Sequence, residues 1–167
     1  MPTLTTRRLT LRAPRLEDFE GYASMVMSER AKYMETGLTR QDAWGWFMSD
    51  TGHWTLYGFG GLMIDVTGTN RTVGLVCLSK GFRFPEVELG WFLYDGEEGK
   101  GYASEATREL RDWSKPKVGS LVSYIAPANS RSIALARRLG ARHDPSAPHP
   151  LGETDENCRV YRHWGAA

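Results

Sequence analysis

The stretch ELGWFLYDGEEGKGYASEATREL (residues 88–110) decides the fold of this chain. It opens with an apolar, aromatic run, passes through Gly99 and Gly101, and ends with alanine and leucine three or four positions apart. This order predicts a strand that leads through a glycine-containing loop directly into a helix over Tyr102–Ser114.

Such a loop is a candidate anion site. Glycines let the backbone turn tightly and approach a ligand closely, and the first N–H groups of a helix have no acceptor within it. Together with the helix dipole, these amides suit a phosphate or pyrophosphate. The amides expected to do so belong to Gly99, Lys100, Gly101, Tyr102, Ala103 and Ser104. From the glycines alone, an ordinary strand-to-helix turn is the alternative, and the spacing fits neither a P-loop nor a dinucleotide fingerprint.

Outward from this stretch, the periodicity predicts further strands and helices. On the N-terminal side they are a short strand around Leu9 and Leu11, a helix over 16–28, a second helix capped by Thr39, and strands over 53–65, 73–78 and 86–94. On the C-terminal side they are a strand over Leu121–Ile125, a helix over 129–139, a loop over 143–157 and a closing strand over Arg159–Trp164. Consecutive strands favour antiparallel pairing, and the strand–helix–strand order favours one parallel crossover. We therefore expect an α/β fold with a mixed sheet.

Composition limits the classes of function. The chain has 167 residues, with 21 Lys and Arg against 20 Asp and Glu and a net charge of +1. This balance gives no indication of nucleic acid or an anionic membrane as partner. The chain has no apolar segment of the kind found in a secretory signal or membrane helix, so we expect one cytoplasmic domain over residues 1–167, as a monomer or homodimer.

Cysteine and histidine give no sign of a metal site. Two cysteines, Cys77 and Cys158, are too few for a disulfide framework or a four-cysteine zinc site. The histidines lack metal-ligand spacing, and we expect no metal.

A second segment adds a family resemblance. APANSRSIALARRLGA (residues 126–141) has an asparagine that caps a helix, a serine three positions later and a terminal glycine. With EGKGYA (98–103) and the opening RRLTLRAPRLEDFEGYA (7–23), it resembles the GNAT superfamily of N-acetyltransferases, in the ribosomal-protein (RimJ/RimL-type) branch. EGKGYA is similar to the pyrophosphate signature of that family, Gln/Arg-x-x-Gly-x-Gly/Ala. The resemblance covers about residues 4–164.

The resemblance implies an acyl-CoA N-acyltransferase fold, in which acetyl-CoA lies between two splayed parallel strands, here 87–94 and Leu121–Ile125. The pyrophosphate would lie on residues 99–103, and the backbone of Leu93, Tyr94 and Asp95 would hold the pantetheine arm. Asn129 and Ser132 would contact the cofactor. Tyr33, Glu35 and Trp44 would wall the pocket of the acceptor, a primary amine on a protein N-terminus or a small molecule.

Direct attack of an amine on a thioester needs a base, a polarised carbonyl and a proton for the thiolate. An alkyl amine is largely protonated at neutral pH, and Glu88 is the expected base. Its alternative roles are to face solvent or to pair with an arginine. A backbone N–H within residues 89–93 would polarise the carbonyl. Ser132 is the expected source of the proton, with Tyr124 as the rival.

Three positions depart from the family pattern. Glu98 replaces the usual Gln or Arg of the signature, so its carboxylate must point to solvent or pair with a cation such as Lys100. Ala136 stands where many members carry a tyrosine that acts as an acid, and Ala141 replaces a phenylalanine after Gly140. The missing tyrosine and Glu98 leave a non-catalytic acyl-CoA-binding or regulatory domain as one alternative. An acyltransferase that uses succinyl-CoA is another.

Overall fold

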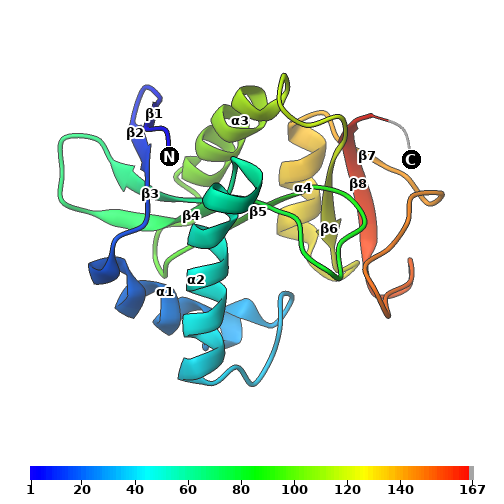
Figure 1. The fold of residues 1–167 in the computed structure, drawn as a ribbon, viewed down its shortest axis with the longest axis horizontal. Coiled ribbons are helices and arrows are strands. Elements are labelled where there is room, and N and C mark those ends of the chain that lie inside the picture. The colour runs from blue at the N-terminus through cyan, green and yellow to red at the C-terminus, as the bar shows by residue number, and fades with distance from the viewer. Residues whose placement is uncertain (166–167) are drawn as a thin grey trace.

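The computed structural model describes residues 1–165, and these residues build one eight-stranded sheet in the order β1-β2-β3-β4-β5-β6-β8-β7 (Figure 1). The elements in chain order are β1 (Leu4–Thr5), β2 (Leu9–Arg12), the 3₁₀ helix η1 (Leu16–Asp18), α1 (Phe19–Val26), the 3₁₀ helix η2 (Glu29–Ala31), α2 (Arg40–Tyr57), β3 (Gly61–Val66), β4 (Thr72–Ser79), β5 (Glu88–Leu93), α3 (Tyr102–Ser114), β6 (Leu121–Ile125), α4 (Ser130–Arg138), β7 (Arg142–His143) and β8 (Arg159–Trp164).

The sheet is antiparallel except where β5 meets β6. These two strands run parallel and share a single bridge, between Glu88 and Val122. Helix α3 makes the crossover between them, as the strand–helix–strand order predicts. The predicted fold class, a mostly antiparallel mixed sheet with flanking helices, is therefore confirmed.

Side chains of the central strands alternate between the two faces of the sheet, and different helices cover the two faces. Leu75 and Phe92 pack with the apolar sides of α1 and α2. Val76 and Leu89 point to the other face and pack there with Ala106 and other α3 residues. Because side chains alternate along a strand, each position in β4 and β5 is assigned to one of these two faces.

The predicted strand over 53–65 is wrong in its first half. Residues 53–57 are the last turns of α2, and β3 begins only at Gly61. The helix continues because Thr39 and Asp42 form a capping box at its start and Gly58, with φ +73°, ends it in the left-handed conformation. Of the residues that suggested a strand, Trp54 packs on the core and on Trp113, whereas Thr55 and Tyr57 are exposed.

Three smaller differences concern element ends. The predicted helix over 16–28 begins with a 3₁₀ turn and ends at Val26. Strand β1 has two residues, too few for a hydrophobic period to indicate it in the sequence. His143, expected in a loop, pairs with β8 as part of β7.

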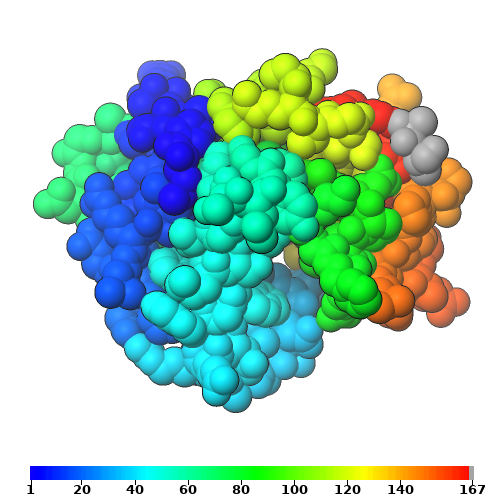
Figure 2. Space-filling model, viewed as in Figure 1, coloured from blue at the N-terminus to red at the C-terminus, as the bar shows by residue number. Residues whose placement is uncertain are grey.

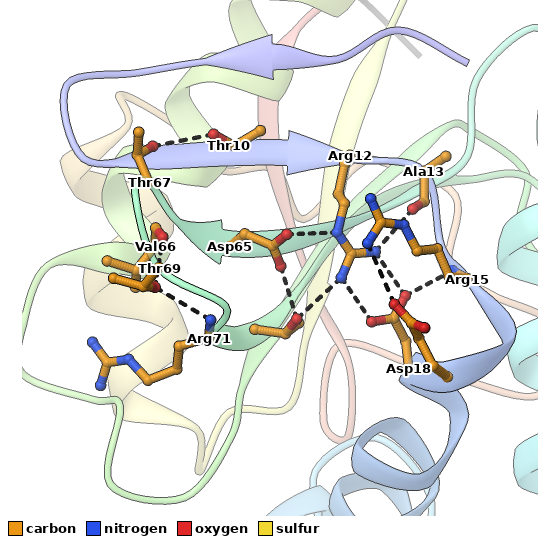
Figure 3. A network of polar contacts seen from close by, with 12 residues as sticks. Thr10, Arg12, Ala13, Arg15, Asp18, Asp65, Val66, Thr67, Thr69 and Arg71 are labelled. Carbon is orange, nitrogen blue, oxygen red and sulfur yellow. Dashed lines mark hydrogen bonds and ion pairs between the residues drawn. The ribbon is translucent and has the colours of Figure 1, made fainter.

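Arg12 joins α1 to the sheet through a network of buried polar contacts (Figure 3). Its guanidinium binds both carboxylate oxygens of Asp18 at 2.7 and 2.8 Å and the carboxylate of Asp65 at 2.5 Å. It also donates to the Thr72 hydroxyl at 3.1 Å. The side chains of Arg12 and Asp18 are only 11% and 4% exposed. One cation thus satisfies groups from η1, β3 and β4.

We predict that Arg12→Ala lowers the free energy of unfolding by about 3–5 kcal/mol, because it leaves two carboxylates with no countercharge in a largely buried place. Urea titration of the two proteins measures this loss. Arg15→Ala, at an exposed ion pair with Glu17, is the control and should change stability by less than about 0.5 kcal/mol. Equal effects of the two substitutions would contradict a structural role for the network.

Candidate active site

The register of β5 on β4 determines which backbone groups point toward β6. The Tyr94 N–H donates to the Val73 carbonyl at 2.8 Å, which makes every second residue of β5 from Glu88 a hydrogen-bonded partner of β4. The intervening residues Leu89, Trp91 and Leu93 therefore direct their N–H and C=O groups away from β4, toward β6.

Only the first of these residues finds partners on β6. The Val122 N–H donates to the Val87 carbonyl at 3.0 Å, and the parallel bridge pattern joins the Leu89 N–H to Val122. The Leu89 carbonyl accepts the buried hydroxyl of Ser123 at 2.7 Å. Beyond this point the described strands share no bridge, so the backbone of Trp91 borders an open gap between β5 and β6.

The loop that follows β5, residues 94–101 (here the cofactor loop), ends in the N-terminus of α3. Gly99 and Gly101 have φ +76° and +81°, and Gly101 caps the helix without a side-chain hydrogen bond. The first N–H bonded within the helix is that of Glu105, which donates to the Gly101 carbonyl at 3.1 Å. A Cβ on Gly99 would meet no atom within 4 Å. A Cβ on Gly101 would lie 3.2 Å from the Arg8 guanidinium, so a cation stands beside the amides of residues 102–104. Amides at a helix start are of the kind that binds a phosphate or diphosphate.

The signature carboxylate Glu98 pairs with Arg30 of η2. Lys100, the cation that the sequence suggested, instead pairs with Glu97 at 2.9 Å. The expectation that a cation neutralises Glu98 is met, but by a residue far away in the sequence.

Glu88 lies on the α1–α2 face of the sheet, because it alternates with Leu89 of the α3 face. It is half-buried and accepts a hydrogen bond from Ser79 at 3.2 Å. The pKa of Glu88 is raised to about 7, mainly by burial and also by the charge of Asp50, while hydrogen bonds from Ser79 and the Tyr124 backbone oppose the shift. None of the ion pairs found within residues 1–165 involves Glu88, so the arginine-paired alternative has no support.

A second carboxylate, Asp50 of α2, faces the same part of the sheet and was not foreseen from the sequence. It accepts a hydrogen bond from the Tyr22 hydroxyl at 2.8 Å, and burial raises the pKa of Asp50 to about 6. Cys77 lies between the two acids, and burial, with help from both, raises the pKa of its thiol. The signal that could have found Asp50 is its place on the buried side of a helix, three residues after Phe47.

Two glycines leave the sheet surface between Glu88 and Asp50 without bulky side chains. Gly61, Cys77 and Gly90 are register partners across β3, β4 and β5. A Cβ on Gly90 would come within 3.0 Å of the Cys77 sulfur. The space-filling view shows the surface hollowed between α2, the segment before it and the loop over residues 80–87 (Figure 2).

The residues expected at the acceptor pocket lie around α2. Tyr33 and Glu35 are exposed in the segment between η2 and α2. Trp44, in the first turns of α2, packs edge-on against Phe19 at 4.9 Å and stays 40% exposed. Their contact with an acceptor remains a prediction.

On α4, the predicted cap is confirmed: Asn129 accepts the Ser132 N–H at 3.2 Å. Ala136, at the position of the family tyrosine, is fully buried with Ile125. Helix α4 packs on the face opposite Glu88, so Glu88 and the helix that carries Ser132 lie on opposite faces of the sheet. Tyr124 has a buried hydroxyl that finds no hydrogen-bond partner among residues 1–165, and burial raises its pKa to about 12.

The sequence profile of the acetyltransferase (GNAT) domain matches residues 8–142. The chain belongs to the GNAT acetyltransferase family. An acetyltransferase from Agrobacterium tumefaciens has a similar crystal structure, with 41% identity, a TM-score of 0.90, and 97% of this chain and 94% of that chain covered. The uncharacterized N-acetyltransferase YnaD of Bacillus subtilis is 24% identical over 145 residues, 84% of this chain and 83% of YnaD.

Structures of lower identity share the fold of this acetyltransferase. One is RimL, a ribosomal-protein acetyltransferase solved with coenzyme A, at 14% identity and a TM-score of 0.70, with 96% of this chain and 97% of that chain covered. RimL-type structures are thus among the neighbours, as the resemblance implied.

Two kinds of feature are absent from residues 1–165. No helix there has the length and apolar character needed to cross a membrane. No group of three or more His, Cys, Asp or Glu is placed there to hold a metal ion.

We predict that Gly101→Val lowers the affinity of this acetyltransferase for coenzyme A about 5- to 30-fold. A β-branched side chain disfavours the left-handed backbone by about 1–2 kcal/mol and would turn the amides away from the diphosphate. Calorimetric titration with coenzyme A measures the loss. Gly152→Val, at φ +87° in the C-terminal loop, imposes the same strain elsewhere and should bind normally. Unchanged affinity in Gly101→Val would exclude the α3 amides as the site.

Proposed function

We propose that this acetyltransferase transfers acetyl from acetyl-CoA to a primary amine by direct attack, with Glu88 as the general base. The observation that carries the proposal is a half-buried carboxylate with a pKa of about 7 at the point where β5 and β6 separate.

For the donor, we assign the amides of Gly99, Lys100, Gly101, Tyr102, Ala103 and Ser104 to the diphosphate. The backbone of Leu93, Tyr94 and Asp95 would hold the pantetheine arm along the open edge of β5. Asn129 and Ser132 would contact the cofactor from α4. Support comes from the uncapped start of α3 and from RimL, a relative by fold that was solved with coenzyme A.

Acetyl-CoA supplies an acyl group activated as a thioester. The task of Glu88 is to take a proton from the amine, whose pKa is about 10 by analogy with lysine. For a carboxylate of ordinary pKa, about 4.3, this proton transfer is unfavourable by a pKa difference of about 6 units, or about 8 kcal/mol. With a pKa of about 7, the difference falls to about 3 units, or about 4 kcal/mol.

The Trp91 N–H is the donor that we assign to the thioester oxygen. It is the first N–H of β5 that points into the gap without a partner on β6. A fixed backbone donor stabilises the negative charge that develops there without reorganisation. Ser132 remains our proposed route for the proton that the departing sulfur needs.

The acceptor would lie in the hollow between α2 and the 80–87 loop, beside Tyr33, Glu35 and Trp44. The acids Glu88 and Asp50 favour an ammonium group there, on a protein N-terminus or a small molecule. They disfavour a succinyl donor, whose carboxylate would meet two like charges. We further propose that the protein works in the cytoplasm, as one domain and as a monomer or homodimer.

Release of coenzyme A thiol, measured with acetyl-CoA and a panel of amines, tests this function. Turnover with at least one amine supports it. Tight binding of coenzyme A without turnover on any amine would instead support a non-catalytic acyl-CoA-binding domain.

We predict that Glu88→Gln lowers kcat about 10²- to 10⁴-fold, the usual contribution of a general base, with little change in the affinity for coenzyme A. In the parent enzyme the base works when ionised, so kcat/KM should rise as pH rises through about 7. Glu88→Gln should lose this rise. A variant that keeps the parent pH profile would remove Glu88 as the base.

Two neighbours should move this pH profile in opposite directions. Asp50→Asn removes a negative charge that raises the pKa of Glu88, so the rise should occur at lower pH. Ser79→Ala removes a hydrogen bond to the carboxylate, so the rise should occur at higher pH. Shifts of the same sign in both variants would show that another group controls the profile.

A further inference from the structure

Arg30 connects the segment between α1 and α2 with the cofactor loop. Its guanidinium pairs with Glu98 and with Asp95, the latter at 2.9 Å. It also lies 3.4 Å from the carbonyl of Leu93, which points toward the gap beside β6. Ser28 fixes the backbone beneath it by accepting the Arg30 N–H at 3.3 Å. Arg30 therefore stands at the rim where the gap meets the loop.

The cofactor loop carries more negative than positive charge. It contains Asp95, Glu97 and Glu98 but only one cation, Lys100. Glu97 is neutralised by Lys100 and by Arg71, at 2.9 and 3.0 Å. Without Arg30, the other two carboxylates would stand uncompensated next to amides that suit an anion, and they would repel a diphosphate.

The two carboxylates hold Arg30 with different strength. Glu98 is 34% exposed and Asp95 is 89% exposed, so solvent screens the contact to Asp95 far more. An arginine offers five donors in a planar fork and binds phosphate oxygens in pairs. One side of the fork can stay on Glu98 while the side on Asp95 changes to another anion.

From this arrangement we propose that Arg30 is a donor-binding residue that supplies the positive charge for the diphosphate of coenzyme A, and that Glu98 holds it in place. The proposal rests on the proposed function for the identity of the ligand. It gives Glu98, the residue that breaks the family signature, the role of anchoring a cation from another part of the chain.

The rival explanation is that Arg30 is only a structural tie between η2 and the loop. Both explanations expect Arg30→Ala to weaken binding. They differ for the double variant Arg30→Ala/Glu98→Arg, which cannot form the ion pair but again places a guanidinium beside the amides.

The experiment is calorimetric titration of the full chain with coenzyme A at low and high salt. Arg30→Ala should weaken binding about 10- to 100-fold, as expected for one charged hydrogen bond, and should reduce the salt dependence. The double variant should recover most of the affinity. Turnover of acetyl-pantetheine, which has no diphosphate, should fall less in Arg30→Ala than turnover of acetyl-CoA does.

Arg40→Ala, which breaks an exposed ion pair with Glu20, is the matched control and should bind like the parent. Parent-like affinity in Arg30→Ala, or a double variant as weak as Arg30→Ala, would overturn the assignment of Arg30. A parent protein that binds no coenzyme A would instead refute the proposed function itself. The two failures are therefore distinguishable.

Discussion

The separation of β5 from β6 after a single bridge is the constraint on which the rest of this acetyltransferase depends. A sheet interior normally pairs all its backbone groups. Here the Ser123 hydroxyl replaces a main-chain donor for the Leu89 carbonyl, and among the described residues the backbone of Trp91 makes no bridge to β6. The gap thus follows from how β5 and β6 are hydrogen-bonded, and it lies between α3 and the face of the sheet that carries Glu88.

The second feature is a set of polar groups on the face of the sheet that α1 and α2 cover. Glu88, Asp50 and Cys77 occupy a sheet face that is otherwise covered by apolar side chains of α1 and α2. Burial of ionisable groups costs stability, and proteins tend to retain it at functional sites. Glu88 accepts a hydrogen bond from the Ser79 hydroxyl, and Asp50 accepts one from the Tyr22 hydroxyl. Each bond orders its carboxylate but stabilises the charged form only in part.

The sequence predicts what is locally encoded. The glycine loop, α3 and the Asn129 cap follow from residues within a few positions of one another, and all are present. The extent of α2 does not follow, because aromatic residues at 54 and 57 suit strand and helix equally until the Gly58 cap decides. Side chains that meet across the fold are also beyond local reasoning. Arg30 with Glu98, and Asp50 with Tyr22, are pairs that only the tertiary structure brings together.

The Arg12 network has a consequence for synthesis of the chain. Arg12 bonds to Asp65 and Thr72, which lie 53 and 60 positions further along. On the ribosome, the N-terminal segment is therefore made well before its partners exist. The apolar side of helix α1 packs with Met63, Leu75 and Phe92, so during translation it stays exposed until β3, β4 and β5 have been made.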